Sequence, residues 1–324
     1  MHAASRQKLI GFATMFLSSS LMGGIGAFAR YIEAPGIFIS FCRNLAGLIL
    51  MTLIFVAGHK YVKFKGFRMT PAIIFSGVFL GLLSGLYVMS TQMTTLANAA
   101  FLIYTGPIYS TILASIFLKE PFTKVTAFSL SSVFVGCLLI IGIINYASGE
   151  GLSVSLDLDP QYFAGNMVAL ASGVAYGLFL FISRYRTDVD SDLRAHTNFI
   201  FAVITLGILV IAIRPDLSGM TARGWIVLVI AAFVTGAAAF YFLTVASKIL
   251  LAGELATISY QETIMATILG IVLFSEGITG MQMLGGALII FGGLAQILFS
   301  TRKTRPAGIA TAEDPLTEGL VAQR

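Results

Sequence analysis

The chain has 324 residues, of which 57% are hydrophobic and only 11% are charged, against roughly 25% charged residues in an average soluble domain. Its charges gather between long apolar runs, which suits a hydrocarbon solvent, so the composition excludes an ordinary soluble domain and predicts an all-α integral membrane protein. The net charge of +5 does not indicate a nucleic-acid partner, because the basic residues are divided among short loops and form no single patch.

Ten apolar runs follow one another along the chain, and each has about the 20 residues that a helix needs to cross a bilayer. The first also resembles a secretory signal, since Ala27-Phe28-Ala29 matches a cleavage site, but its length and its counterpart later in the chain favour a membrane helix. We therefore predict ten transmembrane helices, over residues 9–29, 36–58, 71–92, 96–118, 124–146, 162–183, 195–213, 223–246, 252–275 and 280–300.

The basic residues predict how the chain crosses the membrane. With the N-terminus in the cytoplasm, sixteen Lys and Arg residues fall on that side and three on the other, while Arg43 lies inside a span. Because basic loops stay in the cytoplasm, we expect both termini there, in the cell (inner) membrane of a bacterium or archaeon. Residues 147–161 are predicted to form an acidic external loop, and residues 301–324, which lack apolar periodicity, a disordered cytoplasmic tail.

The chain also matches itself. A shift of 154 residues aligns the first spans with the sixth and those after it, and a shift of 156 aligns the fourth and fifth spans with the ninth and tenth. We predict one five-helix repeat over residues 1–146 and a second over residues 162–300. Because five is odd, the second copy crosses in the reverse sense, as the inverted repeats of secondary transporters do. The matched pairs include Ser18 and Ser172, Gly23 and Gly177, Arg30 and Arg184, Asn44 and Asn198, Tyr87 and Tyr241, Tyr104 and Tyr260, and Glu120 and Glu276.

With this repeat, the chain resembles the EamA-type, ten-helix branch of the drug/metabolite transporter superfamily. The resemblance is carried by Tyr104-Thr105-Gly106-Pro107 with Lys119-Glu120-Pro121, and by Tyr260-Gln261-Glu262 with Ser275-Glu276-Gly277. It implies a basket in which spans 1–4 and 6–9 enclose a cavity, while spans 5 and 10 pack at the periphery. It also implies export of small metabolites, with the aromatic amino acid exporters of the YddG type as the nearest branch. The family often has Glu-Pro in the ninth span, where this chain has Glu262-Thr263.

Two charged residues inside spans are the first candidates for binding. A carboxylate at the middle of a span costs about 2.5–3.5 kcal/mol, which is tolerated when it faces a water-filled cavity, pairs with a cation or carries a proton. Glu262 is therefore expected to contact a substrate amine or to couple transport to protons; a neutral carboxyl that bonds between helices is the alternative. Arg43 is expected to bind a substrate carboxylate, to reach outward to the membrane surface, or to pair with an acidic side chain.

Aromatic residues supply the remaining candidates. Tyr104 and Tyr260 lie too deep in their spans for an interfacial belt, so their hydroxyls need internal partners, either in a cavity or between packed helices. The predicted substrate-binding set comprises Glu262, Tyr104, Tyr260, Tyr87, Tyr241, Tyr176, Met22, Gln261, Phe101, Asn98 and Arg43.

Other classes of function lack their signatures. Three histidines without a His-Glu-x-x-His motif and two cysteines inside apolar runs provide neither a catalytic set nor a metal site, and the sequence contains no phosphate-binding Gly-x-x-x-x-Gly-Lys-[Ser/Thr] loop. We therefore expect no enzyme, no metal and no cofactor. The expected function is secondary active export of small metabolites, among them amino acids including aromatic ones, by alternating access. A carrier of nucleotide-linked sugars or drug-like compounds is the alternative, and a channel or intramembrane enzyme is the alternative from another class. The expected partners are a small-molecule substrate and membrane lipid, with a proton or substrate gradient as the driving force; the sequence leaves the oligomeric state open.

Overall fold

The computed structural model describes residues 2–59, 67, 69–119, 124–141, 144–147, 151–154, 160–185, 191–247, 249, 258–259 and 261–301. Three expectations lie outside these residues: the roles of Tyr260 and Glu120, and the tail that follows residue 301.

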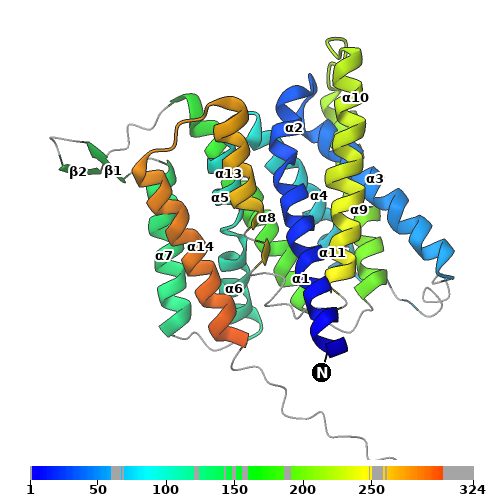
Figure 1. The fold of residues 1–324 in the computed structure, drawn as a ribbon, viewed down its shortest axis with the longest axis horizontal. Helices are drawn as coiled ribbons and strands as arrows, with labels where there is room; N and C mark the ends of the chain where they lie inside the picture. The colour runs from blue at the N-terminus through cyan, green and yellow to red at the C-terminus, as the bar shows by residue number, and fades with distance from the viewer. Residues whose placement is uncertain are drawn as a thin grey trace, which may run out of the picture.

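The first half of the chain zigzags between two faces of a helical bundle (Figure 1). We call the face on which the N-terminus lies the N side and the other the opposite side. The chain leaves the N side in α1 and ends this half on the opposite side in α7. The helices are α1 (His2–Gly23), α2 (Ile25–Tyr31), α3 (Gly36–Ala57), α4 (Pro71–Thr91), α5 (Leu96–Ile103), α6 (Gly106–Phe117) and α7 (Lys124–Ile141).

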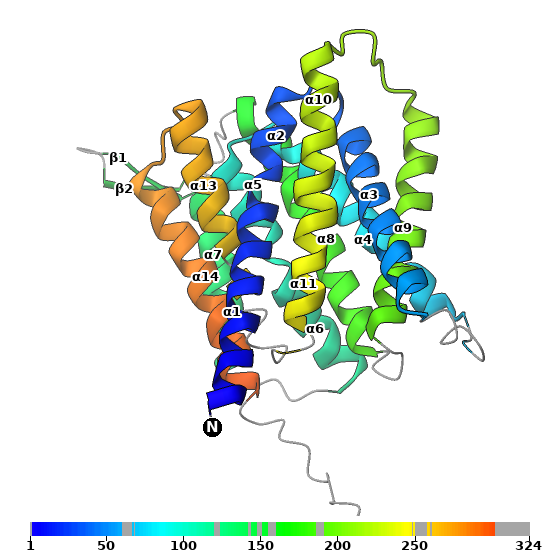
Figure 2. The same ribbon diagram turned by 45° about the vertical axis from the view of Figure 1, so that its right-hand side comes forward.

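The second half begins on the opposite side, so its helices run in the reverse sense to those of the first half (Figures 1 and 2). Thus α1 rises from the N side whereas α8 descends towards it. This half consists of strands β1 (Ile144–Ala147) and β2 (Gly151–Val154), then α8 (Pro160–Tyr185), α9 (Ser191–Ile213), α10 (Ala222–Ala231), the π-helical segment η2 (Ala232–Ala238), α11 (Ala239–Ser247), α13 (Gln261–Phe274) and α14 (Gly280–Thr301).

Within the described residues, seven of the ten predicted spans correspond to helical segments that are long and apolar enough to cross a membrane, and the other three positions hold shorter apolar helices. The seven run over Leu9–Tyr31, Gly36–Ala57, Pro71–Thr91, Leu96–Phe117, Pro160–Ser183, Leu193–Ile213 and Ala222–Leu243; the three shorter helices are Ser131–Ile140, Gln261–Phe274 and Gly280–Gly292. Many of their large apolar side chains are exposed, among them Ile211 at 74% and Val272 at 70%, as expected of surfaces that face lipid.

The predicted fifth span, residues 124–146, is wrong at its end. The helix stops at Ile141, and Ile144–Ala147 pairs with Gly151–Val154 in an antiparallel hairpin, within residues that were expected to continue the helix and to enter a loop. A short apolar run reads the same in hydropathy whether it is helix or strand, which is why the sequence did not separate the two.

The fourth span is interrupted at its middle. The helix stops at Ile103 and resumes at Gly106, so that Tyr104 and Thr105 form a turn inside the bundle. Pro107 stands in the first turn of α6, where its missing N–H leaves no helical hydrogen bond unmade. The interruption places Tyr104 where its side chain points away from the regular helix surface, into the centre of the bundle.

The two halves pack against each other through matching contacts. A Cβ atom placed on Gly23 would lie 2.6 Å from the carbonyl oxygen of Glu262 and 2.9 Å from Cβ of Met265. On Gly177 it would lie 2.8 Å from the carbonyl oxygen of Gly106 and 2.6 Å from Cβ of Tyr109. A shift of 154 residues aligns Gly23 with Gly177. A shift of 156 residues aligns Gly106 and Tyr109, the neighbours of Gly177, with Glu262 and Met265, the neighbours of Gly23. The same helix contact therefore occurs twice, once with the roles of the halves exchanged.

We expect alanine at Gly23 or at Gly177 to destabilise the protein by about 1–3 kcal/mol, because the methyl group meets backbone that cannot move aside. Thermal melting in detergent measures this. Gly219→Ala is the matched control, since no atom lies within 4 Å of a Cβ at that position. Equal melting temperatures for all three variants and the parent would contradict the close approach.

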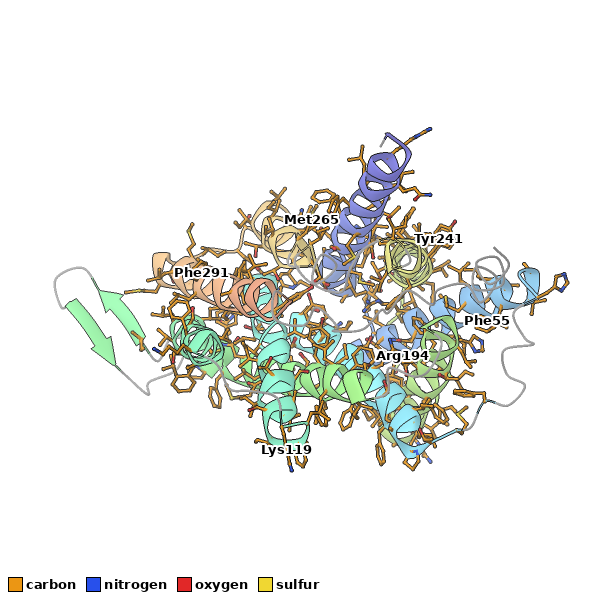
Figure 3. The ribbon with its side chains drawn as sticks, turned by 90° about the horizontal axis from the view of Figure 1, so that it is seen from below. Phe55, Lys119, Arg194, Tyr241, Met265 and Phe291 are labelled. Carbon is orange, nitrogen blue, oxygen red and sulfur yellow. The ribbon has the colours of Figure 1, made fainter. Side chains whose placement is uncertain are left out.

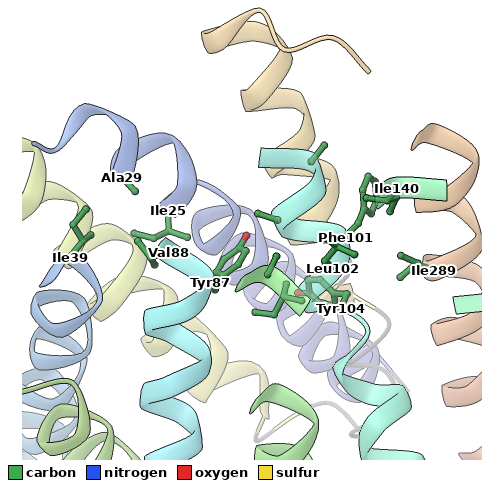
Figure 4. Packing of buried hydrophobic residues seen from close by; sticks show 14 of the residues in the cluster. Ile25, Ala29, Ile39, Tyr87, Val88, Phe101, Leu102, Tyr104, Ile140 and Ile289 are labelled. Carbon is green, nitrogen blue, oxygen red and sulfur yellow. The ribbon is translucent and has the colours of Figure 1, made fainter. Parts of the chain in front are cut away.

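The helices α7 and α14 form a pair at one edge of the bundle (Figures 1 and 2). Gly136 and Gly285 lie against each other where the two helices cross, which lets the backbones approach closely, as small residues do in membranes. The buried cluster at the centre instead joins residues of both halves, with Ile25, Tyr87, Leu102 and Ile289 among its members (Figure 4).

Candidate functional site

A cavity of about 470 Å³ lies between the two halves, and its lining extends to Ser183 near the end of α8 and to Arg194 near the start of α9, towards the N side (Figure 3). Its wall takes residues from α1, α3, α4, α5, α8, α9, α11 and α13, and among the described residues none from α7 or α14. Six of the residues predicted to bind substrate line it: Met22, Arg43, Tyr87, Tyr104, Tyr176 and Glu262.

Glu262 stands in the first turn of α13 and is the one acidic side chain among the described residues of the wall. Its Oε2 atom lies 2.9 Å from the hydroxyl oxygen of Tyr104, which also lies 2.8 Å from the carbonyl oxygen of Ser259. The break between α5 and α6 brings Tyr104 to this position. A phenol has one proton to donate, so the hydroxyl serves one of these two acceptors at a time.

Arg43 lies on α3, is only 7% exposed, and supplies positive charge to the same cavity. Its Nε donates to the carbonyl oxygen of Thr235, 3.1 Å away, and its guanidinium lies 5.7 Å from the centre of the Phe240 ring. Thr235 belongs to η2, in which the wider helical turn leaves carbonyl groups displaced from the usual α-helical bonding. In the described part of the chain neither Arg43 nor Glu262 belongs to an ion pair.

Aromatic rings cover the walls between these charges. The rings of Tyr104 and Tyr176 meet edge to face with centres 6.2 Å apart, and those of Phe199 and Phe240 with centres 4.7 Å apart. Tyr87 and Tyr104 project from different helices within the buried cluster (Figure 4). The cavity is thus apolar along its sides, with one anionic group, Glu262, and two cationic groups, Arg43 and Arg194, among the described residues.

Two amides of the wall were missed as binding candidates. The side-chain nitrogen of Asn44 donates to the carbonyl oxygen of Ser40 and to the hydroxyl of Ser84, at 2.8 and 2.9 Å. The side-chain oxygens of Asn44 and Asn198 are buried and have no hydrogen-bond partner among the described residues. These residues match each other under the shift of 154, and a pair of intramembrane amides at matching positions is the signal in the sequence that could have identified them.

Four other predicted binding residues are described and do not line the cavity. Tyr241 is 45% exposed and lies on the outer face of the bundle, as the view from the N side shows (Figure 3). Phe101 is buried against Gly286 of α14, and Gln261 does not line the cavity. Asn98 lines a separate hollow on the opposite side. The expectation for Tyr241 assumed the orientation of Tyr87, its repeat mate, but η2 precedes Tyr241 and alters the helix phase beyond it.

The hollow on the opposite side has a volume of about 990 Å³ and shares no lining residue with the cavity. Asn98, Thr94 and Gln282 hold polar contacts there: the hydroxyl of Thr94 and the amide nitrogen of Asn98 both donate to the side-chain oxygen of Asn166, and Gln282 donates to the side-chain oxygen of Asn98. This network joins helices of both halves.

An ion pair lies in the wall of this hollow. Arg30, at the end of α2, lies 2.5 Å from Oε1 of Glu276, just past α13, and their side chains are 21% and 10% exposed. Arg30 also donates to the carbonyl oxygens of Thr91 and Thr94, at 3.0 and 2.7 Å. Glu276 accepts the N–H of Leu96, which begins α5. One pair of charges therefore joins the ends of α2, α4, α5 and α13 on the opposite side.

Arg43 belongs to the first half and Glu262 to the second, and neither has a charged counterpart in the other half. The shift of 156 places Gly106 at the position of Glu262, and the shift of 154 places Thr197 at the position of Arg43. The helix contacts follow the repeat, whereas the charges do not. The charged side chains of Arg43 and Glu262 are thus found in one half each, whereas the glycine contacts are found in both.

The long apolar helices indicate a multi-pass helical membrane protein, and charged side chains line a cavity between them. The profile of the EamA-like transporter family matches the chain twice, over residues 9–142 and 163–298. The chain therefore belongs to the EamA-like transporter family and is a membrane transporter.

Relatives agree with this placement. A Clostridium kluyveri protein named as an uncharacterized transporter is 26% identical over 308 residues, which is 91% of each chain. An Archaeoglobus fulgidus protein of the same name is 24% identical over 285 residues, 88% of this chain and 95% of its own. A crystal structure with 18% identity has a similar fold, with a TM-score of 0.58 over 92% of this chain and 98% of its own.

Proposed function

We propose that the protein is a secondary carrier that exports small zwitterionic metabolites with an apolar or aromatic body, amino acids such as phenylalanine among them. The carrying observation is that Arg43 and Glu262 face one apolar cavity and form no ion pair among the described residues. A buried charge needs a partner, and an amino acid supplies both, a carboxylate for Arg43 and an ammonium for Glu262.

The shape of the cavity supports the same class of substrate. Its volume of about 470 Å³ falls in the range of roughly 300–1,000 Å³ that is typical of small-molecule sites. Tyr176, Phe179 and Phe199 cover the sides and fit an aromatic or bulky apolar side chain. The unpartnered side-chain oxygens of Asn44 and Asn198 add acceptors suited to an ammonium group.

We further propose that the two halves are inverted repeats that exchange conformations. The reverse course of the second half, the paired contacts of Gly23 and Gly177, and the two matches to one family profile support this arrangement. In such a pair, exchanging the conformations of the halves moves access to a midplane site from one side to the other. The cavity reaches the N side while Arg30 and Glu276 join the helix ends on the opposite side, which corresponds to a state open towards the N side.

Export is the proposed direction because the excess of basic residues favours a cytoplasmic N side, and a cytosolic solute would then enter the cavity from that side. A nucleotide-linked sugar lacks an ammonium group for Glu262, so the charges of the cavity favour an amino acid over that alternative.

The test is counterflow of labelled L-phenylalanine in liposomes that contain the purified protein. A carrier accumulates label against excess unlabelled solute, and a channel does not. We expect competition by L-phenylalanine, weaker competition by 2-phenylethylamine and by 3-phenylpropionate, each of which lacks one charge, and none by toluene. Competition by all four that is equally strong would contradict recognition of the two charges, and absence of counterflow with every amino acid would contradict the proposed substrate class.

A further inference from the structure

We propose that a chain of amide side chains on the opposite side holds the empty protein in the conformation that is open towards the N side. The chain consists of Gln282, Asn98 and Asn166, with the hydroxyl of Thr94 at its end, and we call it the amide chain. The proposal rests on the exchange of conformations between inverted repeats that is proposed above. It adds what decides which of the two conformations the protein adopts without substrate.

A backbone group fixes the direction of every hydrogen bond in the amide chain. The N–H of Thr279 can only donate, and it lies 3.0 Å from Oε1 of Gln282. The side-chain nitrogen of Gln282 therefore faces Asn98, whose side-chain oxygen is 3.3 Å away. The side-chain nitrogen of Asn98 and the hydroxyl of Thr94 then both donate to the side-chain oxygen of Asn166, at 3.2 and 2.7 Å. Asn98 thus donates and accepts, whereas Asn166 acts in the amide chain as an acceptor.

Every bond between these side chains joins the two halves of the bundle. Thr94 and Asn98 belong to the first half, and Asn166 and Gln282 belong to the second. The carbonyl oxygen of Thr94 also accepts from Arg30, so the amide chain continues into the ion pair described above. A connected polar network therefore holds helix ends of both halves together on the opposite side.

The amide chain lines the hollow of about 990 Å³ on this side. Polar groups at such a surface can exchange a protein partner for water, so that separating the halves leaves none of them without a hydrogen bond. Each bond for this reason makes a modest net contribution. The chain is suited to hold the opposite side closed and still to release it.

The other copy of the repeat contains no equivalent of the amide chain. The shift of 154 places Phe12 at the position of Asn166, and the side chain of phenylalanine has no oxygen or nitrogen to accept a bond. The shift of 156 places Thr126 at the position of Gln282, and threonine lacks an amide that donates and accepts at once. An exchange of the conformations of the halves therefore cannot rebuild the amide chain on the N side.

This asymmetry favours one conformation over the other. Two conformations built from one repeat have similar free energies when each contact has a counterpart. The residues of the ion pair have one in sequence, since the shifts align Arg30 with Arg184 and Glu276 with Glu120. The amide chain has none, so its bonds lower the free energy of the N-side-open conformation alone.

The test measures distances between spin labels by pulsed electron paramagnetic resonance, in purified protein without substrate. The two native cysteines are replaced by alanine. One pair of labels spans the opposite side, on cysteines that replace Pro35 and Gly280, and a second pair spans the N side, on cysteines that replace Phe117 and Tyr241. Pro35, Phe117 and Tyr241 are exposed, and a Cβ at Gly280 has no atom within 4 Å. We expect one main distance for each pair in the parent.

Asn166→Ala removes the acceptor of two bonds between the halves. Because one such bond is worth a factor of roughly two to ten, we expect the ratio of opposite-side-open to N-side-open molecules to rise roughly tenfold or more. The pair on the opposite side then gains a longer distance and the pair on the N side a shorter one. Gln282→Met, which keeps the length of the side chain, removes the bond to Asn98 and should change both distances in the same directions. It decides the matter if Asn166→Ala does not fold.

Two further variants are expected to keep the distances of the parent. Asn166→Asp retains an acceptor oxygen for Thr94 and Asn98. Gln92→Met is the matched control, because Gln92 lines the same hollow and donates to the carbonyl oxygens of Ala29 and Ala34, all within the first half.

Equal distances in the parent, Asn166→Ala and Gln282→Met overturn the proposal. A longer distance on the opposite side without a shorter one on the N side also overturns it, since helix ends would then fray without an exchange of conformations. Counterflow separates this result from the function proposed above. If both distances change but no amino acid gives counterflow, the substrate class fails and the role of the amide chain stands. If the parent gives counterflow and the distances do not change, the carrier stands and the amide chain does not set its resting conformation.

Discussion

Arg43→Met is expected to weaken the binding of L-phenylalanine by roughly 10- to 100-fold, because a hydrogen bond to a charged group contributes about 1.5–3 kcal/mol and each 1.4 kcal/mol is a factor of ten. Methionine keeps much of the apolar stem of Arg43 and removes the guanidinium that faces the cavity. Binding is measured by calorimetry or by the rise in melting temperature with ligand.

The comparison of ligands makes this result specific. 2-Phenylethylamine has no carboxylate, so its affinity should be nearly the same for Arg43→Met and the parent. Arg223→Met is the matched control, since Arg223 lies at the surface in the first turn of α10, with its guanidinium 5.7 Å from the Tyr31 ring. An equal loss of affinity for both ligands would point to a misfolded cavity and contradict a direct contact with the carboxylate.

Arg30→Met is expected to lower the stability of the protein by about 3 kcal/mol, because removing one member of a largely buried ion pair leaves the other charge unpaired. The carbonyl oxygens of Thr91 and Thr94 lose their donor at the same time. Thermal melting in detergent is the measurement, and Arg214→Met, at an exposed position on the same side, should melt like the parent.

A charge reversal sharpens this test. In Arg30→Glu/Glu276→Arg the two charges are still opposite, but a glutamate at position 30 cannot donate to Thr91 or Thr94, and an arginine at position 276 cannot accept from the N–H of Leu96. We therefore expect the double variant to melt no higher than the single one. Full recovery of the melting temperature would show that only the attraction between the charges matters.

Hydropathy and spacing predict the helices of this chain well, because membrane spans are set by one physical demand, the burial of about 20 apolar residues. The same signal cannot mark a break inside a span or a strand beside one. Thus residues 144–146 were assigned to a helix, and the apolar run over residues 96–118 does not mark the interruption at Tyr104 and Thr105.

The sequence allows the charged members of the candidate site to be predicted, because charged residues are rare within membrane spans. Arg43 and Glu262 are conspicuous because charge in a span is expensive, and the structure brings both to one cavity. Helix winding and packing decide which face of a helix a tyrosine occupies. Aligning the repeats by a fixed number of residues does not predict either of them. For this reason Tyr87 is 3% exposed while its repeat mate Tyr241 is 45% exposed.

The wide turn of η2 bonds to Arg43, a residue of the proposed binding site, and the course of the flanking helices does not depend on it. A π-helical turn is an α-helix with an additional residue, so deleting one residue between Ala232 and Ala238 restores ordinary winding and leaves the flanking helices in register. What disappears is the displaced carbonyl group of Thr235, to which Arg43 is bonded. A chain shortened in this way would keep its fold and lose the hydrogen bond that holds the Arg43 guanidinium. Insertion or deletion of one residue in η2 would therefore alter the proposed binding site without altering the helix arrangement.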